Sequence, residues 1–245
     1  MEEESKMVTK DALKRIISDV SSLVKNPLHD NGIYYEHDTE NVLKGYVLII
    51  PKDEKSPYCF GNYLFSLEFP TNYPYSPPKM NYLTNNGNTR FHPNLYRNGK
   101  VCLSILNTWK GEQWSSCNTL SSILLNITTL FTSEPLLHEP GITKTHESFN
   151  DYTTIIEYEN LKTSIHDVLT DSKYVSYMNS SRESFRQVIH DEFKKNKNAI
   201  LKIIEDKIKN ESYENMEVEV EVPFYKMKSI IEYSNLYVKL KEYND

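Results

Sequence analysis

The chain has 245 residues, of which 38% are hydrophobic and 25% are charged, and its formal net charge at pH 7 is −6. This length predicts one domain with a large appendage or two small domains, and the acidic balance excludes a basic surface for nucleic acid. No stretch approaches the roughly 18 apolar residues of a membrane span, and residues 1–6 are acidic and polar where a secretory signal would be basic and then apolar, so we expect an intracellular protein without membrane or nucleic-acid partners.

The first third of the chain predicts one helix followed by antiparallel strands. Apolar residues at three- and four-residue steps predict an amphipathic helix over Thr9–Val24, and an Asn-Pro pair then stops it. Short runs rich in Val, Ile, Tyr, Phe and Leu predict strands of a meander over Lys44–Pro51, Tyr63–Pro70 and Met80–Leu83. The proline-rich segment 73–78 is expected to form an ordered surface loop with aromatic side chains, because it suits neither a helix nor a central strand.

The later part of the chain has a mainly helical pattern. Apolar residues on one side predict a helix over Thr119–Phe131, and helical spacing resumes over residues 152–169. The capping-box pattern Ser180-x-x-Glu183 then precedes a further helix. Val alternates with Glu over residues 217–222, which leaves open a short exposed strand or an extended linker, and the last segment, 230–240, is expected to be a helix.

One short loop offers both halves of an acyl-transfer site. Cys102 lies eight residues after Asn94, and Pro93 fixes its own φ and restricts the residue before it. A thiolate is the nucleophile in acyl chemistry, and a side-chain amide can donate hydrogen bonds to the oxyanion that forms when an acyl carbon is attacked. Asn98-Gly99 is a turn dipeptide that can reverse the chain and bring Asn94 back toward Cys102.

These residues also have plainer interpretations. Asn94 could simply cap the turn, and His92 could hold the loop through backbone hydrogen bonds instead of serving as the base of a Cys/His hydrolase. The three cysteines have the spacing of neither a disulfide framework nor a zinc site, so we expect free thiols in a reducing compartment. Cys59 and Cys117 are expected to be small buried apolar residues.

Five motifs occur in an order and at spacings that resemble one protein family. They are Ala12–Ile16, Ser56–Tyr63, Phe69–Lys79, His92-Pro93-Asn94 with Cys102 eight residues later, and Trp114-Ser115 followed by Thr119–Leu125. They are similar to the first helix, the turn between the second and third strands, the proline loop, the active-site signature and the entry to the second helix of ubiquitin-conjugating enzymes, the E2s. The resemblance covers about residues 10–141, and the elongated stretch after Cys102 looks most like the large Z-type E2s with a C-terminal extension.

The resemblance implies an α+β architecture, the UBC fold. It has an N-terminal helix, a four-stranded antiparallel meander sheet, an active-site loop and a central helix, to which this chain adds a mostly helical C-terminal extension. We expect a flexible acidic N-terminus over residues 1–8, the catalytic core over residues 9–170 and the extension over residues 171–245. The extension could select the activating enzyme, the E1, pack on the core or bind a substrate.

The resemblance also implies an acyltransferase reaction. Cys102 would accept ubiquitin or a ubiquitin-like protein from the thioester of an activating enzyme, the E1, and pass it to a lysine of a protein substrate or to an E3 ligase. Asn94 would donate its amide to the oxyanion, and His92 would position Asn94 through the loop. No metal or organic cofactor is implied, because ATP is consumed by the E1, and we expect a monomer of the cytoplasm or nucleus.

Two surfaces are candidates for these partners. Lys14 and Arg15 on the first helix are candidates for the E1, because a positive face steers an acidic partner, although they could also be ordinary solvated side chains. Tyr75 in the proline loop is a candidate anchor for an E3, together with Ser115 and Ser116.

Two other classes of function stay open. A Cys hydrolase would use Cys102 with His92 as its base and would need neither E1 nor ATP. A non-catalytic binding module of the same fold would not need the thiol. The chain also departs from many E2s, with Ser116-Cys117 in place of Pro-Ala and Ser104 in place of Asp, and the acidic residue that gates many E2 active sites cannot be located.

Overall fold

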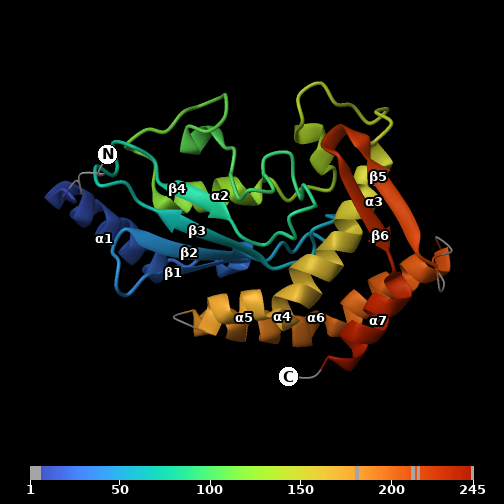
Figure 1. Cartoon of the computed structure of the whole chain (residues 1–245). Coiled ribbons are helices and arrows are strands. Elements are labelled where there is room, and N and C mark those ends of the chain that lie inside the picture. The colour runs from blue at the N-terminus through green and yellow to red at the C-terminus, as the bar shows by residue number, and fades with distance from the viewer. Residues whose placement is uncertain (1–6, 180–181, 211–212, 214–215, 244–245) are drawn as a thin grey trace, which may run out of the picture.

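The chain folds around a four-stranded antiparallel sheet whose strands lie in sequence order (Figure 1). The computed structural model describes residues 7–179, 182–210, 213 and 216–243. The strands are β1 (Ile33–His37), β2 (Lys44–Ile49), β3 (Tyr63–Glu68) and β4 (Lys79–Tyr82). The three predicted strands are confirmed as β2, β3 and β4, and each pairs with its sequence neighbour.

The edge strand β1 has no counterpart among the strands predicted from hydrophobic runs. It pairs with β2 in a register that places Ile33 opposite Ile49. Of its residues only Ile33 is buried, and the others are half-buried. An edge strand of this kind lacks the apolar alternation that identifies a strand in a sequence, and only the family resemblance implied a fourth strand.

Two capped helices cover one face of the sheet. In α1 (Lys10–Lys25) the Thr9 hydroxyl accepts a hydrogen bond from the Ala12 N–H at 3.1 Å, and α2 (Leu120–Thr128) begins with a capping box between Thr119 and Ser122. Both helices confirm the sequence prediction. Their apolar sides form a core with the sheet that includes Ala12, Ile16, Leu23, Val47, Ile49, Tyr63, Phe65, Leu120, Ile123, Leu124 and Ile127.

The C-terminal region adds helices and one hairpin. The helices are α3 (Phe149–Glu159), a π-helical continuation (Asn160–Asp167), α4 (Val168–Thr170), α5 (Ser172–Asn179), α6 (Glu183–Asn210) and α7 (Tyr233–Glu242). Between α6 and α7, β5 (Val218–Val222) pairs antiparallel with β6 (Met227–Ile231). No helix within the described ranges is long and apolar enough to cross a membrane.

The expected mostly helical extension is therefore confirmed, with two refinements. The alternating segment 217–222 forms strand β5, so the strand interpretation is the correct one. The expected final helix is wrong at its start, because Ile230 and Ile231 lie in β6 and the helix begins at Tyr233. Ser180 of the predicted capping box lies outside the described residues. The proposed boundary at residue 170 stays a prediction.

The extension packs against the second face of the sheet. Successive side chains of a strand point to opposite faces, so Val47 and Ile49 join the core under α1 and α2, whereas Leu48 and Ile50 join a second core. In Figure 1 the helices α4, α5 and α6 lie on the opposite side of the sheet from α2. The second core includes Leu48, Ile50, Leu64, Ile165, Val168, Phe185, Ile189, Ile204, Tyr233 and Leu240. Of the three roles left open for the extension, packing on the core is the one observed.

The aromatic side chains of the proline loop differ in exposure, and the prediction for one cysteine is wrong. Tyr73 is fully buried in the proline loop and donates its hydroxyl hydrogen bond to Asp19, whereas Tyr75 is 73% exposed as expected of a surface loop. Cys59 is buried as predicted, but the prediction is wrong for Cys117, which is exposed. Cys117 lies in a turn that precedes α2.

Candidate active site

A tight hairpin brings Asn94 and Cys102 together. Leu95 and Val101 form an antiparallel bridge, and the chain reverses at Asn98-Gly99 between them. Outside the bridge, the Cys102 N–H donates to the Asn94 carbonyl at 2.9 Å, and the Asn94 side-chain Nδ2 donates to the Cys102 carbonyl at 2.7 Å. The prediction that this turn returns Asn94 to Cys102 is confirmed.

The tip of this hairpin is fixed against the sheet. Gly99 has a φ of +88°, and a Cβ at this position would lie 2.2 Å from Asn81 Oδ1. The Gly99 carbonyl accepts a hydrogen bond from the Tyr82 N–H at 2.7 Å, so the tip docks directly on β4. A glycine is required here both by the backbone conformation and by the close approach.

The Cys102 residue is covered in this structure. It is 1% exposed. The Thr108 hydroxyl accepts from the Leu103 N–H at 2.9 Å and donates to the Val101 carbonyl at 2.8 Å, so the peptide groups on both sides of Cys102 are held. A macromolecular partner can therefore reach Sγ only after a local movement of the chain that covers it.

His92 is fully buried and acts on the backbone. Its Nδ1 accepts a hydrogen bond from the Asn94 N–H at 2.9 Å, so the neutral ring carries its proton on Nε2. That Nε2 is buried and has no hydrogen-bond partner among the described residues, and the ring lies edge-on to the ring of His138 with centroids 4.8 Å apart. Burial, followed by the nearby His138 and Arg90, holds the pKa of His92 well below its ordinary value. The ring is neutral and already occupied at Nδ1, which leaves no nitrogen free to accept a proton.

Arg90 is a further residue of this loop that the sequence did not single out. Its Nε donates to the His92 carbonyl at 3.2 Å and its Nη2 donates to the Pro93 carbonyl at 2.5 Å. The guanidinium carbon lies 3.4 Å from the centroid of the Tyr96 ring, in a cation–π contact. Arg90 thus holds the carbonyls of both residues that precede Asn94. No sequence pattern indicated this role, because it depends on the folded conformation of the loop.

The proposed E1 face contains one exposed cation and one that is engaged within the chain. Lys14 is exposed. The Arg15 side chain is 24% exposed, and its guanidinium donates to Asp19 at 3.0 Å and to the Ser116 carbonyl at 2.8 Å. It also donates to the Asn118 carbonyl. Arg15 therefore ties α1 to the turn before α2, so it is less free to meet a partner than Lys14.

The residues expected to face an E3 lie in adjoining loops. Ser115 and Ser116 are exposed, and Tyr75 is exposed on the proline loop. The Trp114 indole N–H donates to the Pro74 carbonyl at 2.6 Å, which joins the two loops. The structure thus places all five predicted partner residues on α1, the proline loop and the turn before α2. Hydrogen bonds join these three segments to one another.

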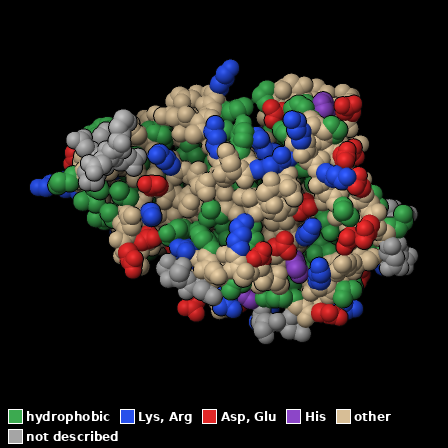
Figure 2. All heavy atoms as spheres, viewed as in Figure 1, with side chains coloured by type: hydrophobic (Ala, Val, Ile, Leu, Met, Phe, Trp, Pro, Cys, Tyr) green, Lys and Arg blue, Asp and Glu red, His purple; other side chains and the backbone are tan. Residues whose placement is uncertain are grey.

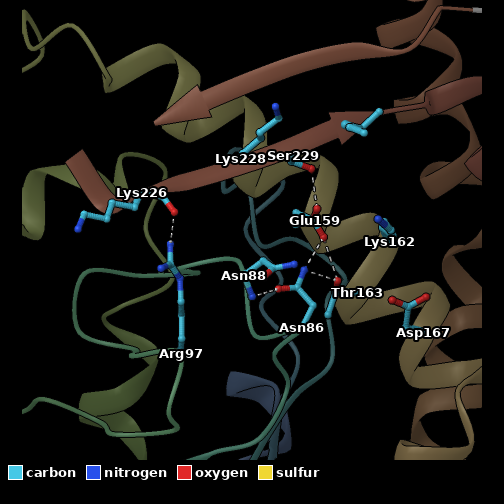
Figure 3. Close-up of a pocket in the computed structure, with 11 residues that line it drawn as sticks. Asn86, Asn88, Arg97, Glu159, Lys162, Thr163, Asp167, Lys226, Lys228 and Ser229 are labelled. Atoms are coloured by element: carbon cyan, nitrogen blue, oxygen red, sulfur yellow. Dashed lines mark hydrogen bonds between the residues drawn. The ribbon is translucent and has the colours of Figure 1, made fainter. Parts of the chain in front are cut away.

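A polar cavity of about 550 Å³ lies where β6 meets α3 and the loop before the active-site hairpin (Figure 3). Its lining includes Arg97 and Lys228 but also the carboxylates of Glu159 and Asp167, and it contains neither Asn94 nor Cys102. Figure 2 shows that cations and carboxylates are likewise interspersed over this face of the molecule. Within the described parts of the chain, no group of three or more His, Cys, Asp or Glu side chains is arranged to hold a metal ion.

Comparison with known proteins identifies what the chain is similar to. The sequence model of the family described as "Ubiquitin-conjugating enzyme" matches residues 15–161, more than half of the chain. The human protein named "Ubiquitin-conjugating enzyme E2 Z" is 38% identical over 161 residues, which cover 64% of this chain and 44% of that protein. The Caenorhabditis elegans protein named "Probable ubiquitin-conjugating enzyme protein 17" is 36% identical over 208 residues, or 79% of this chain and 27% of that protein. The chain thus spans about half or less of the length of these relatives.

Proposed function

The chain belongs to the ubiquitin-conjugating enzyme family, the E2s, and we propose that it carries ubiquitin or a ubiquitin-like protein as a thioester on Cys102. The observation that carries the proposal is the hairpin in which Asn94 and Cys102 exchange two hydrogen bonds, of 2.9 and 2.7 Å. It puts a thiol and an amide donor within one short, rigid turn, which is what attack on an acyl carbon requires.

In the first step the Cys102 thiolate attacks the thioester carbonyl that joins the modifier to the E1. The new C–S bond forms to Cys102, the bond to the E1 sulfur breaks, and the E1 cysteine leaves as a thiolate. One thioester replaces another, so the energy that the E1 drew from ATP is retained and this chain needs no cofactor for the exchange. Because Cys102 is 1% exposed, docking of the E1 must be accompanied by a local movement that uncovers Sγ.

In the second step a lysine amine, or the cysteine of an E3, attacks the Cys102 thioester. The carbonyl oxygen becomes an oxyanion, the C–S bond breaks, and Cys102 leaves as a thiolate while an attacking amine loses a proton. Asn94 Nδ2 carries two hydrogens, and one of them donates to the Cys102 carbonyl. We assign the second hydrogen to the oxyanion, and we assign to His92 the role of holding the Asn94 backbone through Nδ1.

The geometry of His92 supports this transferase over a Cys/His hydrolase. A hydrolase base must accept a proton from the thiol, but His92 Nδ1 already accepts the Asn94 N–H and burial keeps the pKa of the ring well below its ordinary value. No hydrogen bond joins the His92 ring to Cys102 within the described residues.

We propose that the partners are an E1, an E3 and protein substrates, with the chain acting as a monomer in the cytoplasm or nucleus. Exposed Lys14 supports an E1 contact at α1, and the 73% exposed Tyr75, beside Ser115 and Ser116, supports an E3 contact. The role proposed for Arg15 is to hold the turn at Ser116 against α1, so that both contacts form one continuous face.

The test is to mix the purified chain with E1, ubiquitin and ATP and to separate the products on a non-reducing gel. We expect an adduct that disappears on reduction and is absent from the Cys102→Ser variant, with Cys117→Ser as the matched control that still forms it. If no adduct forms with ubiquitin or with any ubiquitin-like protein, the carrier function is excluded. If the Cys102→Ser variant retains all of the protein's function, the chain is a non-catalytic binding module. If the chain turns over an ester substrate without E1 and ATP, it is a hydrolase.

A further inference from the structure

The tip of the C-terminal hairpin contacts the active-site loop directly. Arg97, in the turn between Asn94 and Cys102, donates through Nη2 to the carbonyls of Tyr225 and Lys226 at 2.7 and 3.3 Å. Figure 3 shows Arg97 reaching from the loop to the Lys226 carbonyl at one edge of the polar cavity. The C-terminal region therefore contacts the same hairpin that carries the proposed nucleophile.

A second contact runs through Arg90. The Tyr225 ring centroid lies 5.2 Å from the guanidinium carbon of Arg90, and the Arg90 backbone N–H donates to Met227 Sδ at 3.3 Å. Tyr96, 3.4 Å from the same carbon, provides a second aromatic contact. The Arg90 guanidinium thus contacts one ring of the catalytic core and one ring of the extension, and this fixes the direction of its N–H groups.

Those N–H groups hold the two peptide units before Asn94. Nε and Nη2 of Arg90 donate to the carbonyls of His92 and Pro93, so the orientation of both peptide planes depends on where the guanidinium lies. The direction of the Asn94 side chain follows from those planes. A side chain that contacts the Arg90 guanidinium can therefore alter the position of the Asn94 amide without touching it.

Tyr225 is itself held by neighbours on both sides. Its hydroxyl donates to Glu139 at 2.5 Å, and its ring lies 5.7 Å from that of Tyr152, whose hydroxyl donates to the Arg90 carbonyl at 2.8 Å. Tyr225, Tyr152 and Arg90 thus form one packed group that joins the extension to the active-site loop.

A buried carboxylate holds the C-terminal hairpin at the middle of β6. Glu159 in α3 is 3% exposed and accepts hydrogen bonds from Ser229 of β6 at 2.6 Å, from Asn86 at 2.9 Å and from Thr163 at 3.0 Å. These bonds are drawn in Figure 3. The C-terminal hairpin is therefore anchored to α3 through the middle of β6, and its tip contacts Arg90 and Arg97.

We propose that Tyr225 of the C-terminal extension is a positioning residue for Asn94 and acts through Arg90 on the second, acyl-transfer step. The inference rests on the proposed function. The extension then contributes to catalysis within its own chain, in addition to packing on the sheet. A shift of 1 Å in a catalytic group can cost about 10²-fold in rate, so partial release of Arg90 should slow transfer by about tenfold.

The experiment measures discharge of the preloaded full-length chain. Wild type, Tyr225→Ala, Tyr225→Leu, Tyr225→Phe and the control Ile230→Ala are loaded by E1, the E1 is stopped, and transfer to free lysine is followed over a range of lysine concentrations. Ile230 lies on the same hairpin, is 47% exposed and is not among the contacts of Arg90 described above. Tyr225→Leu retains more apolar volume and is the fallback variant if Tyr225→Ala does not fold. Thermal unfolding is measured for every variant to check that it is folded.

We expect Tyr225→Ala and Tyr225→Leu to lower the rate at saturating lysine by about tenfold, with the half-saturating lysine concentration unchanged, because positioning affects the chemical step. Tyr225→Phe keeps the ring over Arg90 and should restore most of the rate, and Ile230→Ala should match wild type.

The decisive comparison repeats Tyr225→Leu in an Asn94→Ala background. If Tyr225 acts through Asn94, the second substitution should add little to the first, whereas an independent structural effect would lower both backgrounds equally. Equal loss in both backgrounds, or a Tyr225→Leu variant that discharges like wild type, overturns the inference while leaving the carrier function intact. Failure of the wild-type chain to form a thioester with any modifier would instead overturn the proposed function.

Discussion

The substitution Asn94→Ala separates a chemical from a structural role of the side-chain amide. Asn94 is 8% exposed, and its side-chain Nδ2 donates to the Cys102 carbonyl at 2.7 Å. The substitution therefore leaves that buried carbonyl without this donor. We expect the free energy of unfolding to fall by about 1–3 kcal/mol, the range for a buried acceptor that loses its donor. This cost acts on the folded state and does not by itself slow the reaction of molecules that remain folded.

A role for Asn94 at the oxyanion would have a much larger effect on rate. Loss of one donor to an oxyanion typically lowers the rate by about 10²–10³-fold, because the charge that develops in the transition state is no longer stabilised. With an excess of E1, loading of the Asn94→Ala variant can still reach completion. Single-turnover discharge to free lysine measures the rate of the transfer step directly.

The assay therefore compares discharge rates of preloaded wild type and Asn94→Ala below their unfolding transitions. Asn98→Ala is the matched control, since Asn98 lies in the same hairpin and its Oδ1 accepts one local hydrogen bond from the Lys100 N–H at 3.1 Å. We expect Asn98→Ala to discharge like wild type. If Asn94→Ala discharges within about threefold of wild type although its stability has fallen, the oxyanion assignment is refuted and Asn94 only holds the loop.

Two other predictions concern the supporting structure and the thiols. Asp19 is 6% exposed and accepts hydrogen bonds from Arg15, Tyr73 and the Leu120 N–H, so Asp19→Ala should lower the free energy of unfolding by about 3–5 kcal/mol in urea titrations, and a loss below about 1 kcal/mol would contradict this role. Burial, followed by the nearby Glu54, raises the pKa of the Cys59 thiol to about 12, whereas Cys117 is exposed. Alkylation mapped by mass spectrometry at pH 8 should therefore modify Cys117 before Cys59, and the Cys59 rate should rise with pH, because only about 10⁻⁴ of Cys59 is thiolate at pH 8. Equal labelling of the two thiols would contradict the burial of Cys59.

The local elements of this protein were largely predictable. The helices α1 and α2 follow from apolar residues at helical spacing, and three strands follow from short apolar runs. The edge strand β1 was not predictable from such runs because only Ile33 is buried in it. The alternation over residues 217–222 fits a strand or a linker equally well until β6 supplies a partner.

The active-site hairpin was predictable for the same local reason. Asn94, the Asn98-Gly99 turn and Cys102 are close in sequence, so turn chemistry alone brings the amide and the thiol together. The burial of Cys102 and the exposure of Cys117 were not predictable, because each depends on whether distant segments cover the residue.

The sequence alone specifies features that lie within a few residues of one another: the apolar runs of strands, the turn and the spacing of the signature. Contacts across long separations, such as Arg90 with Tyr225 and Glu159 with Ser229, form only when the whole chain has folded. Local patterns reflect backbone conformation and the alternation of buried and exposed faces, which short-range chemistry sets. Which cation meets which ring depends on how the C-terminal hairpin folds back over α3, and no short segment of the sequence contains that information.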